Sequence, residues 1–204
     1  MNHESYIHRA KPGEPGAPIL FMFHGTGGDE NQFFDFGSAL LPNATVVSPR
    51  GDISEHGAAR FFRRKAEGVY DCEDLARATN RMSDFVWANQ EYYKAGPVLG
   101  LGFSNGANIL ANMLIHKPGL FEAAVLMHPL IPFEPQERRS EASSRILITA
   151  GERDPIASVE LTNSLTEYFR RSGDEVSLEW HSGGHEIRSN EIEAAKRFLA
   201  LYAA

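Results

Sequence analysis

Three residues of the types needed for acyl transfer stand far apart in this 204-residue chain, in the order Ser104, Asp154, His185. A serine hydroxyl is a weak nucleophile, so a neutral imidazole must take its proton. A carboxylate must then hold that imidazole in the right tautomer and stabilise its cation. We therefore take Ser104 as a candidate nucleophile, His185 as its base and Asp154 as the acid that orients the base.

Ser104 lies in the segment GFSNG, a G-x-S-x-G motif. The motif alone also fits an ordinary turn serine, but the apolar segment 97–103 before it and the helical spacing of 105–117 after it predict a strand, a sharp turn and a helix. The two glycines then allow strand and helix to approach closely. Together with Gly100 they also approach a dinucleotide fingerprint, but that fingerprint needs a carboxylate at the end of the next strand, and Glu122 opens that strand.

Several histidines compete for the role of base. His181 follows its strand immediately, whereas GGHEI places His185 in a loop with room to reach the serine. His24 and His128 also follow strand-like runs, but the order of a Ser, Asp, His triad disfavours them. We expect His24 and His128 to shape the substrate pocket through hydrogen bonds.

Asp154 has a structural alternative, because an aspartate before Pro155 is a common start for a helix, here 155–171. An oxyanion hole is expected from two backbone N–H groups. One belongs to Asn105, which follows the nucleophile, and the other to Thr26 in the glycine-rich HGTGG loop. For that loop, the alternative is a plain turn.

The stretch RFFRRK, 60–65, is the locally basic part of the chain. We expect its adjacent Phe61 and Phe62 to wall an apolar substrate pocket, with packing in the core as the alternative. Its basic residues favour a solvated loop over a site for an acidic substrate.

Strand-like and helix-like segments alternate along the chain. Apolar runs of strand length occupy 17–24, 44–49, 97–103, 122–128, 145–151 and 175–180, and segments with helical spacing occupy 71–93, 105–117, 155–171 and 189–202. This alternation predicts an α/β fold, a mostly parallel central sheet with helices on both faces. Residues 5–10 are expected to add an edge strand. Ligands of such sheets bind at the carboxyl ends of the strands, where the serine, aspartate and histidine all fall.

The site is expected to lack a cap domain. About 17 residues, 128–144, join the fourth and fifth long strands, and three prolines make them a poor helix. The site should therefore be shallow and open, suited to small or flexible acyl substrates.

The composition of the chain argues against several classes of protein. A formal charge of −7 disfavours nucleic-acid binding, and Cys72 as the sole cysteine excludes an intrachain disulfide or a cysteine-based metal cluster. The N-terminal segment has no apolar signal region, and the longest apolar run is too short for membrane insertion. We expect a single domain over 1–204 in the cytoplasm, with a homodimer compatible with the sequence.

Five segments, HGTGGDE, SPRGD, GFSNGAN, GERDPI and GGHEI, spread over 24–187, resemble the phospholipase/carboxylesterase family of α/β-hydrolases, which also contains the acyl-protein thioesterases. The resemblance implies hydrolysis of carboxylic esters or thioesters through Ser104, Asp154 and His185, with backbone donors at Thr26 and Asn105, and with no cofactor and no metal. Thr26 and NGAN depart from the thioesterase branch and are closer to the bacterial small-ester branch.

The leading hypothesis is a serine esterase that cleaves small carboxylic esters or thioesters through an acyl-enzyme intermediate. One alternative is a small-molecule receptor that keeps the hydrolase fold without turnover. Another is lysophospholipase or acyl-protein thioesterase activity.

Overall fold

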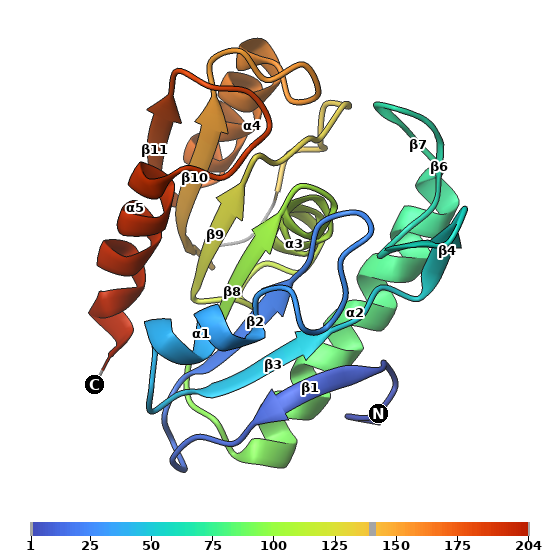
Figure 1. Ribbon diagram of the computed structural model, residues 1–204. Coiled ribbons are helices and arrows are strands. Elements are labelled where there is room, and N and C mark those ends of the chain that lie inside the picture. The colour runs from blue at the N-terminus through green and yellow to red at the C-terminus, as the bar shows by residue number, and fades with distance from the viewer. Residues whose placement is uncertain (1, 139–141, 204) are drawn as a thin grey trace.

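A seven-stranded sheet forms the centre of the protein, seen in Figure 1 as a computed structural model that describes residues 2–138 and 142–203. The strand order is β1-β3-β2-β8-β9-β10-β11, and only β1 runs antiparallel to its neighbour. All six predicted long strands and the predicted edge strand are present. Their bounds are β1 His8–Lys11, β2 Ile19–Phe23, β3 Thr45–Pro49, β8 Val98–Phe103, β9 Ala123–Met127, β10 Arg145–Gly151 and β11 Glu175–His181.

Helices cover both faces of the sheet, as predicted. Those on one face are α2 (Cys72–Tyr93), α3 (Asn105–His116) and α4 (Val159–Arg171), and those on the other are α1 (Phe34–Leu40) and α5 (Ser189–Leu199) (Figure 1). Successive strand side chains point to opposite faces, so neighbouring residues of β2 enter different cores. Phe21 packs with α2 and α3, and Met22 packs with α1. No helix in the described ranges is long and apolar enough to cross a bilayer.

Two of the helices differ most clearly from the sequence prediction. Helix α1 was not predicted, because seven residues are too few to show a helical period. Helix α4 begins at Val159 rather than at Pro155, and its N-cap is Ser158, whose hydroxyl accepts the N–H of Leu161 at 3.4 Å. The alternative role of Asp154 as the cap of this helix is therefore wrong.

Two short hairpins, also absent from the sequence prediction, connect β3 to α2 beside the strand ends (Figure 1). They comprise β4 (Ile53–Glu55) with β5 (Ala58–Arg60) and β6 (Arg64–Ala66) with β7 (Val69–Tyr70). Between β9 and β10, the described residues 128–138 and 142–144 contain no helix or strand, in agreement with the expected lack of a cap. The hairpins thus supply a wall at the strand ends that the sequence pattern does not predict.

Candidate active site

Ser104 sits on a strained turn between β8 and α3. Its φ of 52° and ψ of −116° lie in a region that a residue with a side chain rarely adopts. A Cβ atom on Gly102 would lie 2.5 Å from the carbonyl oxygen of Gly106, and one on Gly106 would strike the carbonyl oxygen of Phe23. Both glycines are therefore required for the close strand–helix packing that projects Ser104 above the sheet edge.

A chain of two hydrogen bonds links the three candidate residues. His185 Nε2 lies 2.8 Å from Ser104 Oγ, and His185 Nδ1 lies 2.6 Å from Asp154 Oδ2. Because a carboxylate only accepts, Nδ1 donates to it, and Nε2 is left to accept the serine hydroxyl. The sequence-predicted nucleophile, base and acid therefore meet from the ends of β8, β11 and β10, in the geometry that proton transfer from serine to imidazole needs.

Asp154 is a buried carboxylate with several donors around it. Its Oδ1 accepts the backbone N–H groups of Ile156 at 2.8 Å and Ala157 at 3.0 Å, while its Oδ2 faces His185 and His128. Burial alone favours the neutral acid, but the hydrogen bonds from His128, from the two backbone N–H groups and from His185 hold the pKa of Asp154 below its ordinary value. Asp154 is therefore ionised at neutral pH.

The loops that carry Asp154 and His185 are packed directly against each other. Glu152 and Arg153 donate their backbone N–H groups to the carbonyls of His181 and Gly183, each at 2.8 Å. A Cβ on Gly151 would strike the carbonyl oxygen of Gly184. This contact fixes the distance between the carboxylate and the imidazole.

Most backbone N–H groups of the HGTGG loop donate hydrogen bonds to other groups of the protein. Gly25 N–H donates to Gln32 Oε1 at 2.9 Å, Gly27 N–H to the carbonyl of Ala59 at 3.0 Å, and Gly28 N–H back to the carbonyl of Gly25 at 3.0 Å. In the described part of the chain, the N–H of Thr26 has no such partner. Of these four donors, Thr26 is thus the one left for a ligand.

The second expected oxyanion donor lies at the start of α3. Within residues 2–138 and 142–203, no hydrogen bond engages the backbone N–H of Asn105, and Thr26 and Asn105 both line the pocket above Ser104. The N-terminus of a helix carries partial positive charge, which favours an anion at that position. The arrangement leaves two backbone donors beside the candidate nucleophile.

His24 lies beneath the loop rather than in the pocket. It is fully buried, its Nδ1 donates to the carbonyl of Gly25 at 2.7 Å, and its Nε2 accepts the N–H of Gly51 at 2.9 Å. These partners require a neutral ring, and burial also lowers the pKa of His24. His24 is therefore not among the residues that line the pocket, but its hydrogen bonds hold the HGTGG loop and so shape the pocket, as expected.

Phe61 and Phe62 belong to the core. Their exposures are 1% and 0%, and Phe61 packs on the ring of His24 while Phe62 packs on Tyr70. The backbone N–H of Phe61 donates to Asn105 Oδ1 at 2.8 Å. The expected substrate-binding role of the two phenylalanines is wrong and the alternative of core packing is confirmed, because the segment between the two hairpins turns both rings into the core.

A pocket of about 340 Å³ opens above Ser104. The hairpins form one wall, in which the buried Arg60 donates to Thr26 Oγ1 at 2.7 Å and Arg64 pairs with Glu55 at 2.9 Å. The lining residues are Thr26, Arg60, Arg64, Glu67, Tyr70, Phe103, Ser104, Asn105, Asn108, His128, Leu130, Ile156 and His185. The basic stretch thus contributes to the pocket instead of forming a purely solvated loop.

His128 reaches the floor of this pocket but has no surface open to solvent. Its Nδ1 lies 2.9 Å from Asp154 Oδ2 and its Nε2 lies 3.0 Å from Glu191 Oε1. His128 thus shapes the floor of the pocket through its hydrogen bonds, as expected, while its fully buried ring leaves no exposed atom for a substrate.

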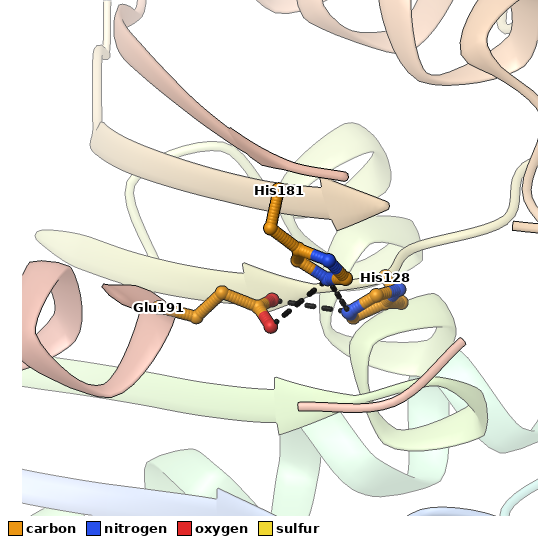
Figure 2. Close-up of side chains that lie close together, drawn as sticks. All are labelled: His128, His181 and Glu191. Carbon is orange, nitrogen blue, oxygen red and sulfur yellow. Dashed lines mark hydrogen bonds and ion pairs between the residues drawn. The ribbon is translucent and has the colours of Figure 1, made fainter. Parts of the chain in front are cut away.

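Two further residues complete the buried group of Figure 2. His181, the rival candidate for the base, points its Nε2 toward Glu191 Oε2 at 3.2 Å. Glu191 lies in the first turn of α5 and is fully buried. Glu191 could not be singled out from the sequence, because an acidic residue in a first helical turn is common at the surface and nothing local marks this one as buried.

Known proteins similar to this chain include hydrolases and a carboxylesterase. A model of the dienelactone hydrolase family matches residues 56–194. The protein MhqD of Bacillus subtilis (strain 168) is 36% identical over 182 residues, 88% of this chain and 91% of that protein. Two solved structures are similar over nearly their whole lengths: protein Atu2452 of unknown function from Agrobacterium tumefaciens str. C58 (63% identity, TM-score 0.96, 99% of each chain) and the Bacillus cereus carboxylesterase (32% identity, TM-score 0.88, 98% of this chain and 95% of that one).

Proposed function

The chain belongs to the dienelactone hydrolase family and is a carboxylic ester hydrolase, and on that premise we propose that it is a serine esterase with Ser104 as nucleophile, His185 as general base and Asp154 as the acid that orients the base. The observation that carries the proposal is the pair of contacts at 2.8 Å and 2.6 Å that links the three side chains. The resemblance to the phospholipase/carboxylesterase family supports the same reaction, since both lead to ester hydrolysis on an α/β-hydrolase fold.

The acylation step uses the front of the site. Ser104 Oγ attacks the ester carbonyl carbon while His185 Nε2 takes the hydroxyl proton, and Asp154 stabilises the resulting imidazolium. The carbonyl oxygen becomes an oxyanion that the N–H groups of Thr26 and Asn105 stabilise. Collapse of this intermediate breaks the ester bond, and His185 returns the proton to the departing alcohol.

Deacylation repeats the same chemistry with water. His185 takes a proton from a water molecule, whose oxygen attacks the acyl carbon on Ser104. The second tetrahedral intermediate collapses to release the carboxylic acid and restores the serine hydroxyl with the proton held by His185. No step requires a cofactor.

The substrate class that the pocket favours is the small carboxylic ester or thioester. About 340 Å³ lies at the low end of the range for small-molecule pockets. Arg60, Arg64 and Glu67 are charged, which confines the apolar wall to the side chains of Phe103, Leu130 and Ile156 and the ring of Tyr70. Each methylene without such a wall forfeits up to about 0.8 kcal/mol, so long acyl chains of lysophospholipids or lipidated proteins are poorer substrates.

A fluorophosphonate tests the proposal without knowledge of the natural substrate. It should attach covalently to Ser104, because phosphonylation uses the same nucleophile, base and oxyanion donors. Peptide mapping by mass spectrometry should find the adduct on Ser104 and none in Ser104→Ala. A folded protein that stays unlabelled at about pH 8 and turns over no p-nitrophenyl ester would favour the receptor alternative.

A panel of esters then separates the remaining alternatives. Short acyl esters of p-nitrophenol and the matching thioesters should be cleaved with higher kcat/KM than a lysophospholipid or a palmitoylated peptide. A reversed order would assign the protein to lysophospholipase or acyl-protein thioesterase activity.

A further inference from the structure

Two ionised carboxylates enclose the ring of His128 from opposite sides. Asp154 Oδ2 lies 2.9 Å from its Nδ1 and Glu191 Oε1 lies 3.0 Å from its Nε2 (Figure 2 shows the Glu191 side). The side chains of all three residues are fully buried. Asp154 Oδ2 is the same oxygen that accepts from His185, so the two imidazole rings share one acceptor atom.

The hydrogen-bond partners of Glu191 identify it as a carboxylate. Glu191 accepts from the hydroxyl of Thr149 at 2.5 Å, from the backbone N–H of Arg188 at 2.7 Å and from the two histidine rings. Burial alone favours a neutral acid, but the hydrogen bonds from His128, Thr149 and Arg188 hold the pKa of Glu191 below its ordinary value. Both nitrogens of His128 therefore face ionised acceptors, and each must carry a proton.

The ring of His181 has a different protonation. Its Nδ1 accepts the backbone N–H of Gly183 at 2.9 Å, so that nitrogen carries no proton and its Nε2 carries one. That Nε2–H donates to Glu191 Oε2, while His128 donates to Oε1. The 3.4 Å between the two Nε2 atoms is thus the separation of two donors directed at one carboxylate (Figure 2).

The same three groups have the composition of a metal site, with two imidazoles and a carboxylate within reach of one ion. A metal would need a free lone pair on Nε2 of both rings. The Nε2 of His181 has no free lone pair, because its Nδ1 accepts the N–H of Gly183 and the ring proton must therefore sit on Nε2. The donor set therefore fits a buried proton better than a metal ion.

We propose that His128 is a positioning residue of the esterase site, a buried imidazolium held by Glu191 that donates to Asp154 Oδ2 and thereby fixes the carboxylate and its charge behind His185. This inference rests on the proposed function of Ser104, His185 and Asp154. The charge of His128 partly offsets that of Asp154, so it sets the electrostatic field in which His185 takes up the proton of Ser104. The direction of the pKa agrees: burial alone would lower the pKa of His128, but the hydrogen bonds to Glu191 and Asp154 raise it above its ordinary value.

The backbone conformation of His128 limits which residues can replace it. Its φ is 52°, a region in which a non-glycine residue is uncommon and persists only where the surroundings hold it. Asparagine is enriched in this region and its amide nitrogen occupies the place of the imidazole Nδ1. His128→Asn therefore keeps the backbone and a neutral donor to Asp154, while it removes the positive charge and the link to Glu191.

The titratable groups that face His128 from the elements around it are Asp154 after β10, Glu191 on α5, His181 at the end of β11 and His185 in the following loop. In His128→Asn, the charge of Glu191 is no longer compensated, which favours the protonated form of His185. The acid limb of the pH profile of kcat/KM should therefore move about one unit toward higher pH, a tenfold loss below the limb. In the double variant with Glu191→Gln, the limb should move back part of the way.

Two controls separate this role from a merely structural one. His181→Asn keeps an acceptor for Gly183 and removes one donor to Glu191 without contact to Asp154, so its acid limb should stay near that of the wild type. Circular dichroism and thermal unfolding should show folded protein for each variant. A His128→Asn limb that coincides with the wild-type limb, or a His181→Asn limb that moves equally, would overturn the proposal.

A measurement independent of activity completes the test. In ¹⁵N-labelled Ser104→Ala protein, the ring nitrogens of His128 should both carry protons at pH 7, while His181 should carry one, on Nε2. A neutral His128 ring, or stoichiometric zinc that is lost in His181→Asn, would overturn the proposal even if Ser104 is labelled as expected. Conversely, a charged His128 beside a Ser104 that fluorophosphonate does not label would reject the esterase mechanism alone.

Discussion

Histidine and carboxylate side chains form two layers at the strand ends, one partly exposed at the pocket surface and one fully buried beneath it. The pocket surface contains Ser104, His185 and Ile156, which are partly exposed, and the buried layer beneath it contains His128 and Glu191, which have no exposed surface. Asp154 belongs to both, because its Oδ2 accepts from His185 on one side and His128 on the other. The same imidazole–carboxylate pair thus occurs twice, once beside a hydroxyl and the pocket and once sealed from water.

Burial decides what each pair can do. A base must exchange a proton with substrate and water, so it needs access to the pocket, as His185 has. A ring between two buried carboxylates keeps its proton, because the ion pairs would otherwise be broken in a medium of low dielectric constant. Residue type alone therefore does not distinguish a reacting group from one that holds it.

The largest effect should come from the pocket surface. Ser104→Ala and His185→Ala should each lower kcat by a factor on the order of 10⁴ to 10⁶, and the double variant should be scarcely worse, because triad members act as one unit. Hydrolysis of a p-nitrophenyl ester measures this. If His185→Ala kept more than about a tenth of the activity while His181→Ala lost it, the assignment of the base would be reversed.

Substitution of a core residue beneath the pocket wall should instead change stability. Phe62→Ala removes a fully buried ring and should lower the free energy of unfolding by about 3–5 kcal/mol, which urea titration measures. Ile156→Ala, at the pocket wall and only partly buried against the core, should lower stability less than Phe62→Ala and shift the acyl chain-length profile. If Phe62→Ala does not fold, Phe62→Leu gives the comparison, and a changed acyl profile in that variant would return Phe62 to the pocket.

The smallest effect should be a pH dependence of stability. Because the pKa of His128 is raised in the folded state, its ion pairs contribute fully below its ordinary value of about 6.5 and are lost as pH rises through the higher folded value. The stability advantage of the wild type over His128→Asn should therefore be greatest below about pH 6.5 and should shrink as the pH rises above that value. Urea unfolding at several pH values measures it, and an advantage that grows with pH would contradict a charged His128.

The sheet could be predicted from the sequence because its signals are local. Continuous apolar runs such as ILFMF (19–23) become buried strands wherever they stand in the order, and helical spacing marked α2 and α3 within a residue at each end. The approach of Ser104, Asp154 and His185 could also be anticipated, since each follows a parallel strand and such strands end at one edge. Short elements such as α1 could not be predicted, because they contain too few residues to show a helical period of apolar side chains.

The sequence by itself determined the order of strands and helices along the chain, the strained glycine-flanked turn at Ser104 and the strand ends on which the reacting residues stand. Only the tertiary structure decided which side of the pocket wall Phe61 and Phe62 face and that Glu191, 63 positions after His128, lies 3.0 Å from it. The physical reason is the separation along the chain of the residues that interact. A strand or a turn follows from neighbours in the chain, whereas burial and the charge of an imidazole depend on groups that the folded sheet brings together from distant segments.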